Sequence, residues 1–527
     1  MKFSIKGKFV DIFRRDIYPA EISILDGKIE SVKQIEESLL NGESNYIMPG
    51  FIDSHCHIES SMLNPIEFGR NAIKHGTIAS VSDPHEIANV CGIDGLEYMN
   101  ECAKLSPMKI FFSLPSCVPA VDFEVTGAKI DAEITKSLIS DDRYIALSEM
   151  MNVPGVLFKD PGVIAKLEAA KGVGKPIDGH APGTTGDALK QYISEGISTD
   201  HEVTTLEEAE EKIALGMKIQ IREGSSAKSL ATLMPLIDKY PRSVLLCTDD
   251  YKAFDLRSGY INKLVACAVK GGCNIYNVIR AASANVVEHY NIPVGLLREG
   301  DDADFIIVNN LDEFDIKAAY IKGKECSNIN YLKYEKCINR FEAEAINAND
   351  IPNPDKEHII GLIKDSLCTK HLTSYDESDN ISTLVCYNRY QKGTIPASAV
   401  VKGFNLSKGA FGSTVGHDSH NITVVGKNNR AIAKVIETLV NMKGGMVVYD
   451  EENVLSLPLP IGGLMSNKSI DEVSAGYKIL HDKIKELGCD LPSPLMTLAF
   501  MSLPVIPSLK ITTKGLFDVD KFEFVKQ

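Results

Sequence analysis

Hydrophobic and polar residues alternate in two ways along this chain. Near the N-terminus, the run AEISILDGKIESV at 20–32 alternates residue by residue, which is typical of half-buried antiparallel strands. From residue 46 to about residue 290, short apolar runs that end in polar residues are separated by longer amphipathic stretches. Strands that alternate with helices in this way predict a parallel sheet.

The region from 46 to 290 contains eight of these strand–helix units. Eight parallel strands, each followed by a helix, form a (β/α)8 barrel of roughly 250 residues. A doubly wound open sheet is the alternative, but it usually carries a glycine-rich phosphate loop, and the sequence has neither G-x-G-x-x-G nor G-x-x-x-x-G-K-[ST]. We therefore expect an α/β fold with a TIM-like barrel, whose strands are 46–55, 77–83, 109–115, 144–150, 175–180, 196–201, 217–223 and 243–249.

Short strands return after the barrel, in VGLLREGDDADFIIVNN at 294–310 and DIKAAYIKGK at 315–324. They can pair with the N-terminal strands, so that both ends of the barrel segment build one small β domain. Beyond a polar linker, strands such as ITVVGK at 422–427 indicate a C-terminal α/β domain. We expect a small β-sandwich-like domain at 1–47 and 291–325, the barrel at 48–290 and the C-terminal domain at 350–527.

The composition narrows the classes of function. The net charge of −15, from 56 basic and 71 acidic residues, argues against nucleic acid as a partner, because nucleic acid would need a basic face. The 12 cysteines form no C-x-x-C pair, which favours reduced thiols and a cytoplasmic location. The uncharged stretch at 491–509 is long enough to cross a bilayer, but its four prolines favour a buried strand-and-loop segment, so we expect no membrane partner.

The polar residues at the strand ends carry the candidate chemistry, because functional groups of such a barrel lie at the C-terminal ends of its strands. His55 and His57 point the same way, since residues two apart on a strand share a face. Alone, a histidine there is more often a packing residue, and an aspartate is usually a helix cap. Together, the strand ends bring imidazoles and carboxylates to one rim: His55, His57, Glu149, His180, His201 and Asp249.

Such a cluster would be costly to hold together without a metal ion that neutralises it. The two histidines of the first strand can hold one cation with Glu149 and Asp249, and Glu149 with His180 and His201 can hold a second. Two cations that share Glu149 would also share a water molecule and lower its pKa toward neutrality, which produces a hydroxide nucleophile. Mixed nitrogen and oxygen ligands suit Zn2+, Mn2+ or Fe2+.

These residues give the sequence a resemblance to a known family. The H-x-H motif, the carboxylate of strand 4, the single histidines of strands 5 and 6 and the aspartate of strand 8 form the pattern of the amidohydrolase superfamily, and nearly the whole chain resembles its adenine deaminases. H-x-H occurs throughout the superfamily, whereas D-P-H-E-I-A-N and G-H-D-S-H-N are far more specific. The resembling segments are PGFIDSHCHIESSM (49–62), DPHEIANV (83–90), SEMMNVPGV (148–156), DGHAPG (178–183), TDHE (199–202), IREGS (221–225), GAFGSTVGHDSHN (409–421), LPIGGLMS (459–466) and LPVIPSLK (503–510).

The resemblance implies a hydrolase that deaminates adenine with water, giving hypoxanthine and ammonia, as in purine salvage. Mn2+ or Fe2+ would be the usual ions, with Zn2+ as a further option, and a homo-oligomer such as a dimer is implied. Dihydroorotase-like relatives usually bridge their ions with a carboxylated lysine, whereas this sequence has Glu149 in that position. The implied binuclear centre is bridged by Glu149, with one ion on His55, His57 and Asp249 and the other on His180 and His201.

The expected mechanism uses a hydroxide between the two ions, which attacks C6 of adenine. Asp249 would take its proton and deliver it to the departing amine, as a general base that becomes a general acid. A further acid should protonate N1 of the ring, and the sequence does not rank Glu202, Glu59 and Glu86 for this role. Substrate contacts are expected from Glu86, Arg222, Glu223 and Ser225, although an internal ion pair would explain residues 222–225 equally well.

Other interpretations stay open. The cluster His417-Asp418-Ser419-His420 either folds over the barrel mouth or makes an interdomain or subunit contact, and a third metal site with His85 or His417 is a further hypothesis. A different amidohydrolase activity, such as N-acetylhexosamine-phosphate deacetylase, is the main alternative, but it gives no account of the C-terminal domain. A non-catalytic barrel scaffold is a third, although such proteins typically lose metal ligands that are all present here.

Overall fold

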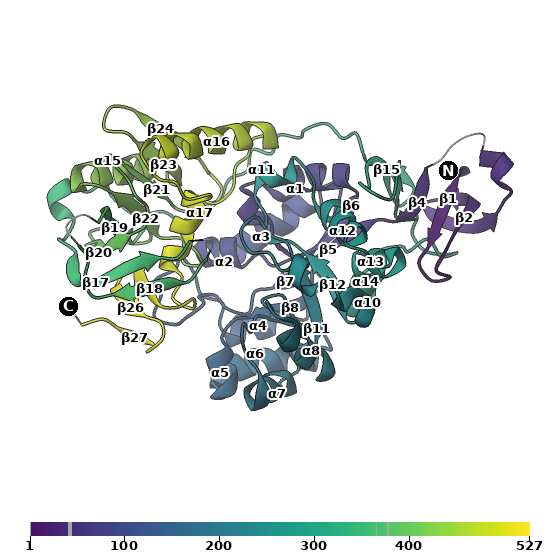
Figure 1. The fold of residues 1–527 in the computed structure, drawn as a ribbon, viewed down its shortest axis with the longest axis horizontal. Helices are drawn as coiled ribbons and strands as arrows, with labels where there is room; N and C mark the ends of the chain where they lie inside the picture. Colours follow the sequence, from purple (N-terminus) through teal and green to yellow (C-terminus); the bar gives the residue numbers. More distant parts are fainter. Residues whose placement is uncertain (1, 41–44, 365, 377–378, 527) are drawn as a thin grey trace. The chain divides into compact units, whose positions relative to one another are not determined.

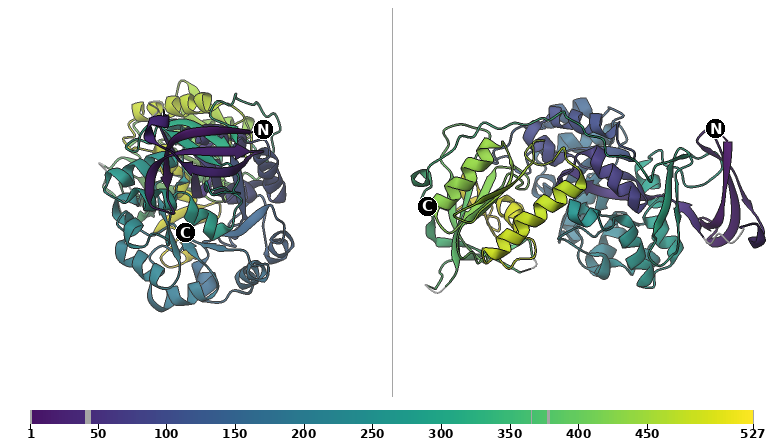
Figure 2. Two further views of the ribbon diagram at one scale, coloured as in Figure 1. Left: turned by 90° about the vertical axis from the view of Figure 1, so that its right-hand side faces the viewer. Right: turned by 90° about the horizontal axis from the view of Figure 1, so that it is seen from above.

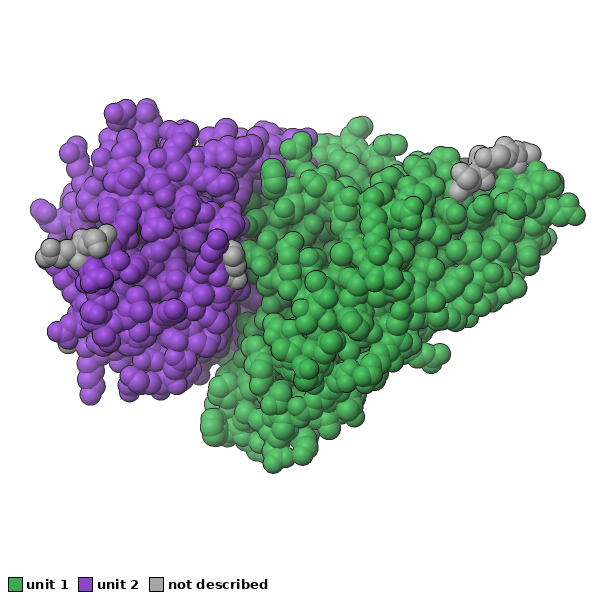
Figure 3. All heavy atoms as spheres, viewed as in Figure 1, with its two compact units in different colours: residues 1–84, 99–116, 131–332 green, residues 85–98, 117–130, 333–527 purple. Residues whose placement is uncertain are grey.

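The computed structural model describes residues 2–40, 45–364, 366–376 and 379–526, which form two compact units (Figure 3). Unit 1 consists of residues 1–84, 99–116 and 131–332. Unit 2 consists of residues 85–98, 117–130 and 333–527. Two segments from within the predicted barrel region, 85–98 and 117–130, therefore belong to the same unit as the C-terminal part of the chain.

Unit 1 contains the predicted parallel strands, each at its expected place in the sequence. They are β5 (Phe51–His57), β6 (Thr77–Ser82), β7 (Lys109–Leu114), β8 (Tyr144–Met150), β9 (Ile177–Gly179), β10 (Thr199–Asp200), β11 (Lys218–Arg222), β12 (Val244–Cys247) and its continuation β13 (Asp249–Asp250). One sheet has the order β13-β5-β6-β7-β8-β9 and another the order β10-β11-β12. A parallel bridge from Ile177 to Ile197 joins them, and β13 pairs with β5, so the strand order returns to its start. The expected barrel is confirmed.

Helices follow these strands, and polar side chains cap several of their N-termini. Asn64 accepts a hydrogen bond from the backbone N–H of Glu67 in α1 (Pro65–Ala72), and Asp131 caps α4 (Ala132–Leu138) in the same way. The further helices of unit 1 are α5 (Val153–Leu157), α6 (Pro161–Gly172), α7 (Gly186–Ser194), α8 (Leu206–Ala214), α9 (Leu230–Leu233), α10 (Leu236–Lys239), α11 (Ala253–Leu256), α12 (Ile261–Lys270), α13 (Ile275–Ala281) and α14 (Ala284–Tyr290).

A second sheet of unit 1 draws its strands from both ends of the barrel segment, as expected. Its strands are β1 (Lys2–Asp11), β2 (Asp16–Leu25), β3 (Lys28–Gln34), β4 (Tyr46–Pro49), β14 (Phe305–Val308), β15 (Ile316–Ile321) and β16 (Lys324–Glu325). Their order is β16-β15-β14-β4-β1-β2-β3, and the purple N-terminal strands lie side by side in Figures 1 and 2. Buried apolar residues that include Phe9, Ile22 and Phe305 form its core.

The C-terminal part of unit 2 is an α/β structure, which confirms the expected class. Its main sheet has the order β18-β17-β20-β19-β22-β21-β23-β24. These strands are β17 (Asp355–Leu362), β18 (Thr369–Leu372), β19 (Ile381–Tyr387), β20 (Ala397–Lys402), β21 (Ala410–Ser413), β22 (Ile422–Gly426), β23 (Gly445–Tyr449) and β24 (Val454–Pro458). The helix α15 (Asn429–Asn441) buries its apolar face against this sheet, and α16 (Ile470–Glu486) lies further along the chain (Figure 1). The helix α2 (His85–Cys91) and the start of α3 (Ile93–Ala103) complete the unit.

The uncharged stretch at 491–509 is buried, but it is not the strand-and-loop segment that the sequence predicts. It forms the helix α17 (Pro494–Ala499) and a 3-10 turn at Phe500–Ser502 before it enters β25 (Leu509–Thr512). Pro494 occupies the first turn of α17, where a missing backbone N–H costs nothing, so this proline starts a helix instead of interrupting one. Strand β25 forms a small sheet with β26 (Gly515–Asp518) and β27 (Glu523–Phe524). No helix of the described chain is both long and apolar enough to cross a membrane.

Candidate metal centre

The strand ends of the unit 1 barrel bring the six predicted metal ligands together. His55 and His57 lie at the end of β5, and Glu149 lies at the end of β8. His180 and His201 follow β9 and β10 directly. Asp249 opens β13, which is hydrogen-bonded to the histidine end of β5. The proximity of these residues follows from the closed ring of parallel strands, because it places all of their C-terminal ends on one side.

Glu149 lies at the middle of the group, and its two oxygens face different histidines. Oε1 lies 3.2 Å from Nε2 of His57 and 3.8 Å from Nε2 of His55. Oε2 lies 2.7 Å from Nδ1 of His180 and 3.2 Å from Nε2 of His201. A carboxylate with two imidazoles on each oxygen has the arrangement that a ligand shared between two cations requires.

Asp249 faces the same two histidines as Oε1 of Glu149. Its Oδ1 lies 3.0 Å from Nε2 of His57 and 3.5 Å from Nε2 of His55. Its Oδ2 accepts a hydrogen bond of 2.6 Å from Nη1 of Arg222, which also donates to Glu202 at 2.5 Å. Arg222 therefore fixes the carboxylates of Asp249 and Glu202 in one place.

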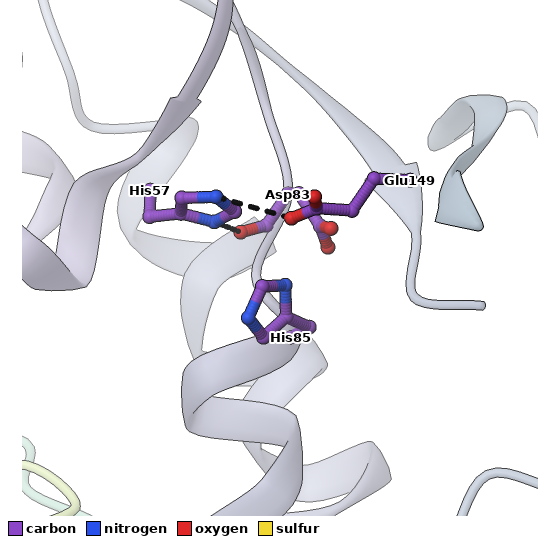
Figure 4. Close-up of side chains that lie close together, drawn as sticks. All are labelled: His57, Asp83, His85 and Glu149. Atoms are coloured by element: carbon purple, nitrogen blue, oxygen red, sulfur yellow. Dashed lines mark hydrogen bonds and ion pairs between the residues drawn. The ribbon is translucent and has the colours of Figure 1, made fainter. Parts of the chain in front are cut away.

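A backbone contact orients the ring of His57. Its Nδ1 lies 3.1 Å from the carbonyl oxygen of Asp83, just after β6, and can donate to it (Figure 4). With the proton on Nδ1, the Nε2 atom that points toward Glu149 keeps its lone pair for a cation. His85, which Figure 4 also labels, belongs to unit 2.

The carboxylates of the centre favour their charged form, and their charges raise the pKa values of His57, His180 and His201. Burial lowers the pKa of His55 to about 4, so this imidazole is neutral, as a metal ligand must be. Burial alone would raise the pKa of Glu149, but His201 and the hydrogen bond with His180 hold it well below its usual range. Burial likewise opposes ionisation of Asp249, but Arg222 and the two histidines of β5 keep its pKa well below the usual range.

The residues present fit a divalent metal. Nε2 of His55 is buried and has no hydrogen-bond partner among the described residues, although it faces two carboxylates. Ligand atoms that share an ion at about 2.0–2.2 Å lie roughly 3–3.5 Å from each other, close to the distances around Glu149 and Asp249. Imidazole and carboxylate ligands without a cysteine are typical of Zn2+, Mn2+ or Fe2+.

A buried hydrogen-bond network behind the ligands was not found from the sequence. The carboxylate of Asp53 accepts from the hydroxyls of Thr248 and Tyr260, both at 2.5 Å, and from the backbone N–H groups of His55 and Thr248. It therefore ties β5 to the chain just before Asp249, whose φ of 59° lies in the left-handed region. The only signal in the sequence is that Thr248 directly precedes a predicted ligand.

The predicted catalytic glutamates lie in different surroundings. Oε1 of Glu202 is 3.8 Å from Nδ1 of His180 and 3.8 Å from Nε2 of His201, so Glu202 lies at the centre. Glu59 is buried in the 3-10 turn that follows β5. Glu86 belongs to unit 2, where both of its carboxylate oxygens contact histidines.

The predicted substrate-binding residues at the end of strand β11 also differ in the contacts that they make. Arg222 is part of the centre, as its contacts with Asp249 and Glu202 show. Glu223 accepts from the backbone N–H of Leu230, and Ser225 donates to Asp255. Glu223 and Ser225 therefore form hydrogen bonds that stabilise the loops in which they lie.

Comparisons with known proteins agree with this geometry. The amidohydrolase family matches residues 46–326, and the adenine deaminase C-terminal domain matches residues 363–523. An adenine deaminase of Methanosarcina mazei is 46% identical over 98% of this chain and 98% of its own length. One from Parabacteroides distasonis is 45% identical over 99% of this chain and 98% of its own length.

Among solved structures, an N-acetyl-D-glucosamine-6-phosphate deacetylase from Mycobacterium smegmatis is similar at 12% identity with a TM-score of 0.46. The similarity covers 61% of this chain and 99% of that protein. The two matching family regions together extend through both units of the chain. The chain belongs to the amidohydrolase family and, within it, to the adenine deaminases.

Proposed function

We propose that this protein hydrolyses adenine to hypoxanthine and ammonia. The observation that carries the proposal is a barrel centre with four imidazoles around one carboxylate, in a chain that matches adenine deaminases over nearly its whole length. The alternative deacetylase activity is not favoured, because relatives at 42–46% identity are named adenine deaminase.

The proposed ligands form two sets that share Glu149. Bound divalent ions would supply Lewis-acid activation of a water molecule between them. Glu149 is the proposed bridging ligand, which is supported by the histidines that face each of its two oxygens. The two sets are His55, His57 and Asp249 for one ion, and His180 and His201 for the other.

Asp249 is the proposed proton shuttle. Oδ1 faces the histidines of β5, while the hydrogen bond from Arg222 holds Oδ2 in place. In this position Asp249 would accept a proton from the attacking water and then donate it to the exocyclic amine, which leaves as ammonia. Arg222 orients this carboxylate and favours the charged form that Asp249 has before the first transfer and regains after the second.

Glu202 is the proposed acid for N1 of the purine ring. Its Oε1 lies 3.8 Å from both His180 and His201, so this carboxylate faces the second set of ligands. Glu59 and Glu86 stay as alternatives for this role. Glu86, Arg222, Glu223 and Ser225 stay predicted substrate contacts, for which the ion pairs of Arg222 favour a role at the reacting end.

The test is ammonia release from adenine by the purified full-length chain after reconstitution with Mn2+, Fe2+ or Zn2+. We expect ammonia and hypoxanthine in equal amounts, with activity that needs about two metal equivalents per chain. Turnover of N-acetylglucosamine phosphate without turnover of adenine would replace the proposal by the deacetylase. Binding of less than about one equivalent of metal, with no turnover of either compound, would favour the scaffold.

Membership in the adenine deaminase family also supports proposals for the metal ion, the oligomeric state and the cellular location. Mn2+ or Fe2+ is the proposed physiological ion, since both accept imidazole and carboxylate ligands, with Zn2+ as the further option. A homo-oligomer such as a dimer is proposed, to be measured by light scattering of the full chain. A cytoplasmic location is proposed from the cysteines, all 12 of which are free thiols in the structure.

A further inference from the structure

Unit 2 contains a second group of imidazoles and carboxylates. His85 and Glu86 form the first turn of α2, and His417, Asp418 and His420 lie in the connection between β21 and β22. All five are buried, with at most 4% of the surface of any of them exposed. Three histidines and two carboxylates that are withdrawn from water need strong partners, since unpaired charges are costly in a protein interior.

Glu86 is the centre of this group. Its Oε1 contacts Nδ1 of His417, and its Oε2 contacts Nε2 of His420. Nδ1 of His420 accepts a hydrogen bond from the backbone N–H of Gly416, so the proton of this ring is on Nε2, which donates to Glu86. His420 therefore holds the carboxylate of Glu86 from one side and leaves Oε1 directed toward the other histidines.

Two further atoms of the group, Nε2 of His85 and Oδ1 of Asp418, lie near Oε1 of Glu86 and Nδ1 of His417. Nε2 of His85 lies 3.7 Å from Oε1 of Glu86 and 4.0 Å from Oδ1 of Asp418. Nδ1 of His417 lies 3.9 Å from the same Oδ1 of Asp418. These distances are too long for hydrogen bonds, but they are only slightly longer than the roughly 3–3.5 Å between two atoms that bind the same ion.

A third carboxyl group lies beside Asp418. Glu124, also in unit 2, lies next to Asp418, and its Oε2 is buried without a hydrogen-bond partner among the described residues. A cation between His85, Glu86 and Asp418 would relieve this crowding of carboxyl groups.

We propose that unit 2 binds a divalent transition-metal ion of its own. The ligands are Nε2 of His85, Oε1 of Glu86 and Oδ1 of Asp418, and the Nδ1 contact of His417 holds Oε1 of Glu86 in place. His420 acts from outside the ligand set, since it orients Glu86 as second partners of metal ligands commonly do. Mixed nitrogen and oxygen ligands favour Zn2+, Mn2+ or Fe2+ over Ca2+ or Mg2+.

This site is proposed independently of the deaminase activity. Its ligands all belong to unit 2, whereas the proposed binuclear centre uses residues of unit 1. The full-length chain should therefore bind three divalent ions, of which one depends on residues 417 and 418. The proposal gives Glu86 a role as a metal ligand, in place of the substrate contact that the sequence predicts.

The test counts metal ions in the full-length protein. Apoprotein is prepared with a chelator, loaded with Zn2+ or Mn2+ by equilibrium dialysis and analysed by mass spectrometry of the bound metal. We expect three ions per chain for the wild type, two for Asp418→Asn, and weaker binding of one ion for His417→Gln, which loses a partner of Glu86. His481→Gln, at a histidine on α16 outside the group, is the matched control and should keep three.

Spectroscopy and a further variant separate a metal ligand from a residue that only supports the fold. Wild type and Asp418→Asn are both loaded with Co2+. The difference between their visible absorption spectra should show the band of one Co2+ ion. His420→Gln should weaken binding of one ion roughly 10- to 100-fold, because it removes only the outer partner of Glu86. Circular dichroism checks that each variant is folded, and the wild-type count tests the site even if a variant is not.

The outcomes distinguish this proposal from the deaminase. Two ions in the wild type and two in Asp418→Asn would overturn the unit 2 site and leave the binuclear centre. Two ions in the wild type and one in Asp418→Asn would support the unit 2 site and reject a binuclear centre. Ammonia release from adenine, measured in the same samples, tests the deaminase independently of either count.

Discussion

Asp249 combines two kinds of contact that rarely occur on one carboxylate. One oxygen faces two imidazoles, and the other accepts a short hydrogen bond from a buried arginine. Loss of the negative charge should have a larger effect on the chemistry than on the fold, because an asparagine in its place would keep the size of the side chain. Asp249 is therefore the residue whose role as a proton shuttle is easiest to isolate.

We predict that Asp249→Asn folds and binds metal but loses deamination by at least about 100-fold, the lower end of the usual contribution of a general acid–base. The assay is ammonia release from adenine, together with the metal content of the same sample. Asp250→Asn is the matched control, since the carboxylate of Asp250 accepts from Ser60 and is not one of the predicted ligands. An Asp249→Asn enzyme with full activity would remove the shuttle from the mechanism.

Glu202 offers a second test at the scale of single residues. We predict that Glu202→Gln lowers kcat/KM by roughly 10²- to 10⁴-fold, because Gln cannot supply a proton to N1 of the ring. Glu59→Gln, at a buried glutamate of the turn after β5, is the comparison and should have a smaller effect. A larger loss for Glu59→Gln than for Glu202→Gln would transfer the role of the ring acid to Glu59.

The network around Asp53 supports the ligands without contacting the substrate. We predict that Asp53→Asn lowers stability by about 1–3 kcal/mol, since four donors share the two oxygens of Asp53 and an asparagine keeps only one acceptor oxygen. Metal affinity should fall as well, because Asp53 fixes the backbone of His55 and Thr248. The measurements are thermal unfolding of the apoprotein and equilibrium dialysis. Tyr260→Phe, which removes one donor only, should lie between the wild type and Asp53→Asn in both.

The metal ligands could be predicted from the sequence, but their supports could not. Each ligand ends a short apolar run, so the barrel rule alone places His55 and Asp249 at one rim. Asp53 contacts Thr248 and Tyr260 across separations of 195 and 207 residues, and the sequence marks only Thr248, by its place before Asp249. Residue pairs of this kind become visible only when the barrel closes.

At the scale of elements, strand positions follow the apolar runs, but strand ends do not. The predicted strand 46–55 is two strands, because β4 pairs with β1 in the outer sheet and β5 pairs with β6 in the barrel. Gly50 separates them, and a Cβ atom there would lie 2.4 Å from the side chain of Ile78. The change of sheet therefore needs a glycine, which the apolar pattern of this stretch does not reveal.

Strand β25 contains a buried lysine with a pH-dependent cost. Nζ of Lys510 donates to the carbonyl oxygens of Leu367 and Phe500, and burial lowers the pKa of Lys510 to about 8. Below pH 8 both the folded and the unfolded chain hold the proton, and burial of the charge costs about 3 kcal/mol. As the pH rises from about 8 to 10.5, the folded chain loses the proton first, so stability increases.

We predict that the free energy of unfolding of the wild type rises relative to Lys510→Met between pH 8 and pH 10.5, by up to about 3 kcal/mol. The measurement is urea unfolding of both proteins at a series of pH values. Lys514→Met, at an exposed position beside the same strand, is the matched control. A constant difference between wild type and Lys510→Met across this range would contradict the prediction.

At the scale of the whole molecule, the sequence predicts one unbroken barrel segment at 48–290 and a C-terminal domain at 350–527, whereas unit 2 is assembled from three parts of the chain. Residues 85–98 and 117–130 look like ordinary connections of a barrel, so their membership in unit 2 has no signal in the hydrophobic pattern. The contacts of these two segments with residues 333–527 show that they belong to unit 2. Arg340 donates to the carbonyl oxygen of Gly127, Asn421 donates to that of Val125, and two histidines contact Glu86.

This division predicts the behaviour of a truncated chain. A protein that ends at residue 332 keeps the barrel strands but loses the unit 2 partners of 85–98 and 117–130. Ile87 and Val90, which are buried, would then be left without most of their unit, and Glu86 would lose both histidines. Exposed apolar surface of this kind promotes aggregation. We therefore expect chain 1–332 to be insoluble or aggregated in size-exclusion chromatography.

Co-expression provides the matched control for this truncation. If the missing partners cause the defect, residues 333–527 supplied as a separate chain should restore solubility and elute together with 1–332, because unit 2 can then form from all of its parts. Thermal unfolding of the rescued pair would show whether unit 1 regains a cooperative transition. A chain 1–332 that is monomeric, soluble and cooperatively folded by itself would instead mean that residues 85–98 and 117–130 need no partner from the C-terminal part.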